Sequence, residues 1–419
     1  MSKPRPLRLL HSSDWHLGRP LCGRRRYDDY ARFLDWLAAT LDREQVDVLL
    51  LAGDIFDCLN PSTRAQALYY NFLGRVAVQS ACRHVVVIAG NHDSPALLKA
   101  PGEILKLLDI HVVGTVSEDG REELITLKDP DGRPELLAAA VPYPRERDMR
   151  SSVAGESAGD KEERLVAAIG EHYALLGRLA EAALAGLDPR PPAVALGHLF
   201  AAGGRTLEED GARNLYVGAL GRVPLDVFPP LFDYVALGHL HQPQLLGGRE
   251  TRRYSGAPLA LGFGEAGREK TVVLVDFYPD GPQVRTLPVP LFRRLERIRG
   301  DWAFIAAELS RLADLEEDIW VDVEYDGTDL QGELGGRLAE AVEGRRVTVL
   351  RVRDGRARPL ALEALESGES LDSLDEEEVF RRCLAARQVP EEDRAELTAA
   401  YLEILRDLRE NADREGGRS

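Results

Sequence analysis

The stretch VVVIAGNHD, from Val85 to Asp93, decides the fold and points to the site. Five apolar residues are followed directly by a glycine and then by Asn91, His92 and Asp93. A short apolar run rich in β-branched residues predicts a buried strand. The polar side chains that follow it would then lie at the carboxyl end of that strand.

The same arrangement recurs along the first part of the chain. Four further segments follow short apolar runs: Asp14-Trp15-His16, Gly53-Asp54, Gly197-His198 and Gly238-His239-Leu240-His241. Five of the nine histidines lie in these segments, and we expect the other four, His11, His84, His111 and His172, to be structural. Nitrogen and oxygen donors without thiolates suit Mn²⁺, Fe²⁺ or Zn²⁺ better than a structural cysteine-zinc site. The sequence therefore predicts a metalloenzyme.

Length and composition set the outer limits. A chain of 419 residues is long enough for two or three domains. Met1 to Leu10 contains no apolar signal core, and no apolar stretch approaches the ~20 residues that span a bilayer, so we expect a soluble cytoplasmic protein without membrane contact. Cys22, Cys58, Cys82 and Cys383 show no paired spacing, which predicts neither disulfides nor a zinc ribbon.

The net charge of −17 counts at first sight against nucleic acid as a partner, because phosphate binding draws on clustered Lys and Arg. However, the sum counts metal ligands as negative, and acidic residues accumulate in the C-terminal third. Four arginines follow the first motif: Arg19, Arg24, Arg25 and Arg26. They form either a solvated loop or, beside a phosphate-ester site, a clamp for the phosphate backbone.

Strands and helices alternate from the start of the chain. Strands are expected at Leu7 to His11, Val46 to Ala52 and Val85 to Ala89, with helices between them. The first helix is indicated by Tyr30, Phe33, Leu34, Leu37 and Leu41 at helical spacing, and the second runs from Pro61-Ser62 to about Ser80. This βαβαβ pattern predicts a layered α/β domain with right-handed crossovers and ligands at the carboxyl ends of its strands.

Three regions are expected along the chain: a catalytic domain over 1–285, a small α+β domain over 291–365 and a helical tail over 373–413. Within the first, strands are expected at 136–141, 193–196 and 234–237, a polar loop at 150–163, a long helix to about 185, and a closing hairpin at 271–277 with an Asp280-Gly281 turn. Strands at 319–325 and 347–352 belong to the second. The tail has an apolar stripe, which either packs on the preceding domain or docks to a partner helix: Leu397, Tyr401, Ile404, Leu405 and Leu408.

The ligand list can be divided between two ions. Residues two apart at a strand end share a face, so Asp14 and His16 can reach one ion. Two ions about 3.5–4 Å apart need a bridging ligand, and Asp54 is the obvious carboxylate. We assign to the first ion Asp14, His16, Asp54 and His241, and to the second Asp54, Asn91, His198 and His239. Which of the last two histidines serves which ion is left open.

Such an ion pair activates water for attack on phosphorus, and the leaving alkoxide then needs a proton. His92 follows a ligand but is not needed as one, so it is the candidate general acid. Asp57 lies three residues after Asp54. It either orients His92 through a carboxylate hydrogen bond or caps a turn, and these two roles are left open.

Taken together, the motifs resemble the calcineurin-like metallophosphoesterases, whose pattern is D-x-H, G-D, G-N-H-[DE], G-H and G-H-x-H. Within that superfamily the chain is similar to the SbcD family over nearly all of residues 1–280. The sequence motifs on which this resemblance rests are HSSDWHLG (11–18), GDIFD (53–57), GNHDS (90–94), ALGH (195–198), ALGHLHQPQ (236–244) and YSGAP (254–258). More loosely, the small domain resembles the family's capping domain.

The resemblance implies a dimeric nuclease that degrades double-stranded DNA ends and cleaves single strands and hairpins, in recombination, replication and break repair. It implies two divalent ions, Mn²⁺ first and Mg²⁺, Fe²⁺ or Zn²⁺ as alternatives. The helical tail would bind the coiled-coil base of the ATPase SbcC, in a complex of two SbcC and two SbcD chains, and exonuclease activity would need ATP hydrolysis by SbcC. Asp57 stands where archaeal relatives have a second histidine, so its role toward DNA strands is open.

Two other classes compete with the nuclease. A phosphatase or phosphodiesterase of small substrates would use the same ions, but Ser/Thr phosphatases follow the second Asp of this motif with an arginine that grips the monoester dianion. Here Cys58 follows Asp57. A metal-free binding module would have lost ligands, and none is lost.

Overall fold

The computed structural model describes residues 5–149, 158–201, 223–327 and 333–354, together with 380, 381, 384, 394 and 397–402. The chain divides into two compact units, one ending at Leu295 and the other beginning at Glu296. Among the described residues, none of the helices is both long enough and apolar enough to cross a membrane.

The first unit contains two six-stranded sheets, with strand orders β12-β11-β1-β2-β3-β4 and β5-β6-β7-β8-β10-β9. In the first sheet, β1 to β4 are parallel to one another and β11 is antiparallel to β1. Its strands are β1 (Leu7–Ser12), β2 (Val48–Ala52), β3 (His84–Ile88), β4 (Ile110–Val113), β11 (Thr271–Tyr278) and β12 (Gly281–Pro288). Those of the second are β5 (Leu124–Lys128), β6 (Pro134–Ala140), β7 (Ala193–His198), β8 (Tyr234–Gly238), β9 (Gln244–Leu246) and β10 (Arg249–Tyr254).

The two sheets face each other across an apolar layer, as the alternation along β2 shows. Leu50 and Ala52 point into this inner layer, whereas Leu49 and Leu51 point to the outer face. All five β2 residues are buried, because both faces of the strand are covered. This double burial explains why the predicted strands have continuous apolar runs instead of alternating polar and apolar residues.

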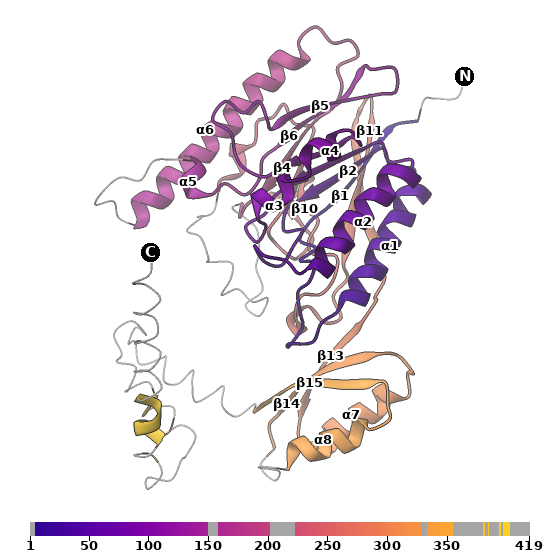
Figure 1. Ribbon diagram of the computed structural model, residues 1–419, viewed down its shortest axis with the longest axis vertical. Coiled ribbons are helices and arrows are strands. Elements are labelled where there is room, and N and C mark those ends of the chain that lie inside the picture. Colours follow the sequence, from indigo (N-terminus) through magenta and orange to yellow (C-terminus); the bar gives the residue numbers. More distant parts are fainter. Residues whose placement is uncertain are drawn as a thin grey trace. The chain divides into compact units, whose positions relative to one another are not determined.

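Helices cover the outer faces of the sandwich (Figure 1). Helices α1 (Tyr27–Arg43) and α2 (Thr63–Gln79) lie side by side over the first sheet, and the long α6 (Ala158–Leu184) lies over the second. Ser62 caps α2 by accepting a hydrogen bond from the N–H of Ala65. Short helices α3 (Pro95–Lys99), α4 (Gly102–Lys106) and α5 (Glu146–Met149) and the 3₁₀ turns η2 (Leu225–Val227) and η3 (Phe263–Glu265) complete the unit.

The predicted βαβαβ order and layered α/β class are confirmed, as is the hairpin, but its two-residue turn is Pro279-Asp280 because Gly281 already pairs with Tyr278. The polar loop predicted at 150–163 is wrong in its second half, since α6 begins at Ala158. Residues 159–164 are exposed because this end of the helix extends into solvent. A solvated helix end has no apolar stripe, so its sequence is as polar as that of a loop.

The second unit has a three-stranded sheet of order β13-β14-β15. Along the chain it contains β13 (Arg294–Gly300), α7 (Trp302–Ala313), β14 (Ile319–Tyr325), α8 (Leu334–Val342) and β15 (Val347–Asp354). Ile305 and Leu309 of α7 pack with Val321 and Val323 in one core. The two strands predicted here are confirmed. Most of the predicted tail lies outside the described residues; of its stripe, Leu397 and Tyr401 are described and helical.

Candidate metal centre

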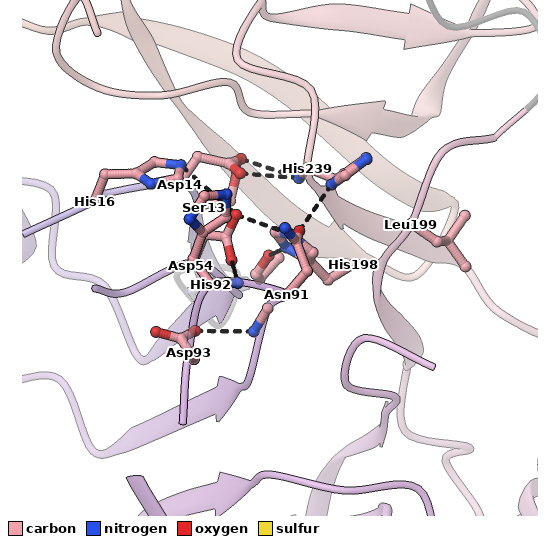
Figure 2. Close-up of polar contacts among 12 residues, drawn as sticks. Ser13, Asp14, His16, Asp54, Asn91, His92, Asp93, His198, Leu199 and His239 are labelled. Atoms are coloured by element: carbon pink, nitrogen blue, oxygen red, sulfur yellow. Dashed lines mark hydrogen bonds and ion pairs between the residues drawn. The ribbon is translucent and has the colours of Figure 1, made fainter. Parts of the chain in front are cut away.

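The polar segments predicted to share one site come together at one edge of the sandwich (Figure 2). Asp14 and His16 follow β1, Asp54 follows β2, and Asn91 and His92 follow β3. From the second sheet, His198 ends β7, and His239 and His241 follow β8. The carboxyl ends of parallel strands from both sheets therefore supply the site, as expected for an open α/β sheet.

Asp54 lies at the centre of this group. Its Oδ2 is 3.6 Å from Nε2 of His16 and 3.2 Å from Nε2 of His198. Its Oδ1 accepts a 2.9 Å hydrogen bond from the backbone N–H of His92. One carboxylate oxygen thus lies between a histidine of each predicted ion site, which is the position that a bridging ligand needs.

The remaining predicted ligands form two groups around Asp54. Nitrogen or oxygen atoms of Asp14, His16 and His241 lie within 4.8 Å of one another. On the other side, Oδ1 of Asn91 is 3.1 Å from both Nε2 of His198 and Nδ1 of His239. The geometry thus places His241 with the first predicted set and His239 with the second, while the ions that they serve stay a prediction.

The backbone at the ligands adopts an uncommon conformation. Asp14, His16 and Asp54 have φ angles of 53°, 46° and 51°, and that of His239 is 100°. Positive φ in residues other than glycine is costly and concentrates at functional sites. Gly53, with φ of 86°, would place an added Cβ 2.3 Å from Nδ1 of His198, so only glycine fits there. For Asp54 and His239 the sequence signal is the glycine directly before the residue, whereas Asp14 and His16 follow Ser13 and Trp15.

The electrostatics of the buried site suit cations. Burial alone would lower the pKa of His198, but the charge of Asp54, the hydrogen bond to its carboxylate, the charge of Asp14 and the Ala52 carbonyl together outweigh burial and raise this pKa to about 9. Burial and the charge of His198 together lower the pKa of His239 to about 3. Nε2 of His16 is buried without a hydrogen-bond partner among the described residues, whereas Nδ1 faces the Asp57 carboxylate at 3.4 Å. Buried carboxylates together with this unpartnered imidazole nitrogen fit divalent cations, which would compensate the carboxylate charge and use the nitrogen as a ligand.

His92 and Asp57 are in contact, but not as expected. Nδ1 of His92 lies 2.9 Å from the backbone carbonyl oxygen of Asp57, so the hydrogen bond involves the main chain and not the carboxylate. The Asp57 carboxylate lies 3.4 Å from Nδ1 of His16 and 3.2 Å from Nη1 of Arg19. Asp57 therefore contacts a predicted ligand through its side chain and the predicted acid through its backbone.

Two buried acidic residues near the site were not assigned from the sequence. Asp93 accepts hydrogen bonds from the N–H groups of Ile55, Phe56 and Gly90, and its burial raises its pKa to about 6. It thereby ties the turn after β3 to the turn after β2. Its place in the GNHD motif could have indicated this role. Glu265, near His241, had no motif to mark it.

The four histidines expected to be structural lie away from this cluster. His11 contacts Tyr234, His84 contacts Glu135, and His172 contacts Glu123, which is buried. His111 is half-buried on β4. The first three of these histidines make internal hydrogen bonds to the residues named.

The arginines that follow the first motif differ in their burial and contacts. Arg26 is buried and donates to the carbonyl oxygen of Ala260, so its role is structural. Arg19 reaches Asp57, whereas Arg25 is exposed. Neither of the two expectations describes all four residues.

This sandwich, with predicted ligands at the strand ends of both sheets, has the arrangement of a metal-dependent phosphoesterase. A family model described as "Calcineurin-like phosphoesterase" matches residues 7–243, and the chain belongs to this family. A second model, SbcD_C, described as "Type 5 capsule protein repressor C-terminal domain", matches residues 291–388.

Curated relatives narrow the family further. The chain is 35% identical over 405 residues to the SbcD subunit of the nuclease SbcCD from Escherichia coli (strain K12), covering 96% of this chain and 98% of that protein. The protein of the same name from Rhodobacter capsulatus is 40% identical, over 73% of this chain and 76% of its own length. The one from Bacillus subtilis is 36% identical, over 65% of this chain and 67% of its own length. Within the phosphoesterases, the chain is therefore a member of the SbcD family of metal-dependent nucleases.

Proposed function

We propose that this chain is the nuclease subunit of an SbcCD-type complex and hydrolyses phosphodiester bonds in DNA with two divalent cations, Mn²⁺ first. The observation that carries the proposal is the single Asp54 oxygen lying between His16 and His198. When bound, such a cation pair activates water and neutralises charge on the phosphoryl oxygens. Asp14, His16, Asp54 and His241 would hold one ion, and Asp54, Asn91, His198 and His239 the other.

His92 has the geometry of a proton donor to the leaving oxygen. A carbonyl oxygen can only accept, so the Nδ1 that faces the Asp57 carbonyl carries a hydrogen. This leaves Nε2 to hold and release the transferable proton. The ring is half-buried, and its backbone N–H is fixed to Asp54, so the donor is held beside the predicted bridging ligand.

A cationic cavity next to this residue favours an extended anion as substrate. A cavity of about 660 Å³ is lined by Leu59 and Ser94, which lie two residues beyond Asp57 and His92. Its charged lining is Lys99, Arg145 and Arg147 against one acid, Glu146. Arg145 donates to the carbonyl oxygen of Asp93 at 2.8 Å and pairs with no carboxylate in the described part of the chain. The cations of this cavity would compensate the negative charge of a DNA backbone that continues beyond the cleaved bond.

The partner and the finer activities are proposed on the basis of the family. The relatives are named as subunits of SbcCD, which supports an SbcC ATPase as the partner of this chain, in the cytoplasm. We propose that the C-terminal helices of this chain contact SbcC, in an assembly of two SbcC and two SbcD chains built on a dimer. The complex would digest double-stranded DNA ends with ATP and cleave single strands and hairpins endonucleolytically. These activities would serve recombination, replication and break repair.

The test is hydrolysis by the full chain in Mn²⁺, measured with and without an SbcC partner and ATP. We expect cleavage of a hairpin DNA that EDTA abolishes, and digestion of duplex ends only with SbcC and ATP. A phosphomonoester such as p-nitrophenyl phosphate should be hydrolysed poorly. Activity confined to the monoester would replace the nuclease by the alternative, a phosphatase of small substrates.

A further inference from the structure

Three histidines of the site share an orientation, whereas His239 faces Asn91 with Nδ1. Nδ1 of His198 lies 2.8 Å from the carbonyl oxygen of Ala52, and Nδ1 of His92 lies 2.9 Å from that of Asp57. Nδ1 of His16 lies 3.4 Å from the Asp57 carboxylate. In His16 and His198 the other nitrogen, Nε2, is the one near Asp54. An acceptor behind Nδ1 fixes the ring tautomer and directs the Nε2 lone pair toward a metal.

A carboxylate from a distant part of the chain faces Nδ1 of His241, at ion-pair distance and beyond the length of a hydrogen bond. Oε1 of Glu265, the last residue of η3, lies 4.0 Å from Nδ1 of His241. Glu265 is only 1% exposed, and this oxygen is buried without a hydrogen-bond partner in the described ranges of the chain. The other oxygen, Oε2, accepts from the N–H of Leu261 and from Lys270. One oxygen is thus fixed in place while its neighbour faces the imidazole.

Lys270 connects the same pair to the backbone of His241. Its Nζ binds Glu265 and donates to the carbonyl oxygen of His241 at 3.3 Å. The N–H of Ala257 donates to that same carbonyl at 3.1 Å. Burying a charged pair is costly unless each charge is well compensated. Here the buried pair contacts both the main chain and the ring of one predicted ligand.

We propose that Glu265, held by Lys270, is a positioning residue that fixes His241 with Nε2 directed at the first cation and strengthens its binding. The inference rests on the proposed dimetal site. It adds a residue that lies outside every motif of the sequence. A carboxylate behind a metal-binding histidine raises the basicity of the ligand, and removal of such a partner commonly weakens metal binding by about 10–100-fold.

The experiment is a Mn²⁺ titration of the full chain, followed by EPR of the free ion, which needs no substrate. For Glu265→Gln we expect two Mn²⁺ to bind, with affinity for one of them lowered about tenfold or more. The matched control is Glu123→Gln. Glu123 is equally buried and contacts His172 at 2.7 Å, but that histidine is not a predicted ligand. We expect its Mn²⁺ affinities to equal those of the wild type.

A second variant covers the case in which Glu265→Gln fails to fold because Lys270 is left unpaired. Glu265→Gln combined with Lys270→Met removes both charges, and we expect the same weakened site. Wild-type affinity in whichever of these variants folds would overturn the positioning role. The outcome is separable from the proposed function: a wild-type protein that binds two Mn²⁺ but cleaves no DNA contradicts the nuclease and not the role of Glu265.

Discussion

At the scale of single residues, the site depends on side chains that each make two kinds of contact. Asp54 faces two histidines with one oxygen and binds the N–H of His92 with the other. Asp57 approaches His16 with its carboxylate and His92 with its carbonyl. Two aspartates thereby connect the predicted ligands with the predicted proton donor, and His92 itself is not among the predicted ligands.

We expect His92→Ala to retain both Mn²⁺ ions and lose hairpin cleavage by a factor of about 10²–10⁴, because the leaving oxygen no longer receives a proton. The measurement is a single-turnover cleavage rate beside a Mn²⁺ titration. His111→Ala, which removes a half-buried histidine away from the site, should change neither. Unchanged cleavage by His92→Ala would take the acid role from His92.

His11 provides a pH prediction away from the metals. It is fully buried, and burial followed by the charge of Arg253 lowers its pKa to about 3. Below its ordinary pKa of about 6.5, the unfolded chain takes up a proton that the folded chain does not. This histidine therefore stabilises the fold above about pH 6.5, and its contribution is lost as the pH falls toward about 3.

The check is urea unfolding of the metal-free protein at about pH 7.5 and about pH 4.5, for wild type and His11→Gln. The wild type should lose about 3 kcal/mol more unfolding free energy between these pH values than the variant, since the interval from about pH 6.5 to about pH 4.5 spans about two pH units at about 1.4 kcal/mol each. Equal losses would show that His11 does not remain neutral in the folded state.

At the scale of elements, the site forms where the ends of β2, β7 and β8 approach closely. A Cβ added at Gly238 of β8 would lie 1.9 Å from the carbonyl oxygen of Ala52 and 2.8 Å from Nδ1 of His198. That carbonyl is the one that holds His198. The glycine thus sets the distance between the two sheets at the point where their ligands meet.

We expect Gly238→Ala to push back the Ala52 carbonyl, destabilise the fold by about 1–3 kcal/mol and weaken Mn²⁺ binding. Gly74→Ala is the contrasting variant: its Cβ in α2 would meet no described atom within 4 Å, and alanine in a helix is favoured by about 1 kcal/mol. Thermal unfolding and Mn²⁺ titration measure both effects. A Gly238→Ala protein with wild-type Mn²⁺ affinity would contradict this account of the contact.

At the scale of the whole molecule, the predicted metal site lies within one of the two units. All predicted ligands lie in the unit that ends at Leu295. The second unit has a core of its own around Ile305, Val321 and Leu338. Within the tail, the rings of Phe380 and Tyr401 stack with centroids 4.0 Å apart, so residues distant in this segment contact each other.

Deletion of the chain from residue 373 onward should therefore abolish binding to an SbcC partner while leaving Mn²⁺ binding intact. Co-purification with SbcC and a Mn²⁺ titration measure the two properties on the same truncated protein. If the truncated chain still forms the complex, the contact with SbcC lies elsewhere on the molecule.

The sequence by itself determined the class of the fold and the predicted ligands, because each is encoded locally. A run such as VLLLA of β2 must be buried on both faces, and Gly-Asp or Gly-His after it marks the turn that exposes a ligand. Tertiary structure alone decided the contacts between residues far apart in the chain, since these depend on how two sheets pack. It placed the Asp57 carbonyl, instead of its carboxylate, on His92, and it brought Glu265 to His241, where no spacing in the sequence could indicate a partner.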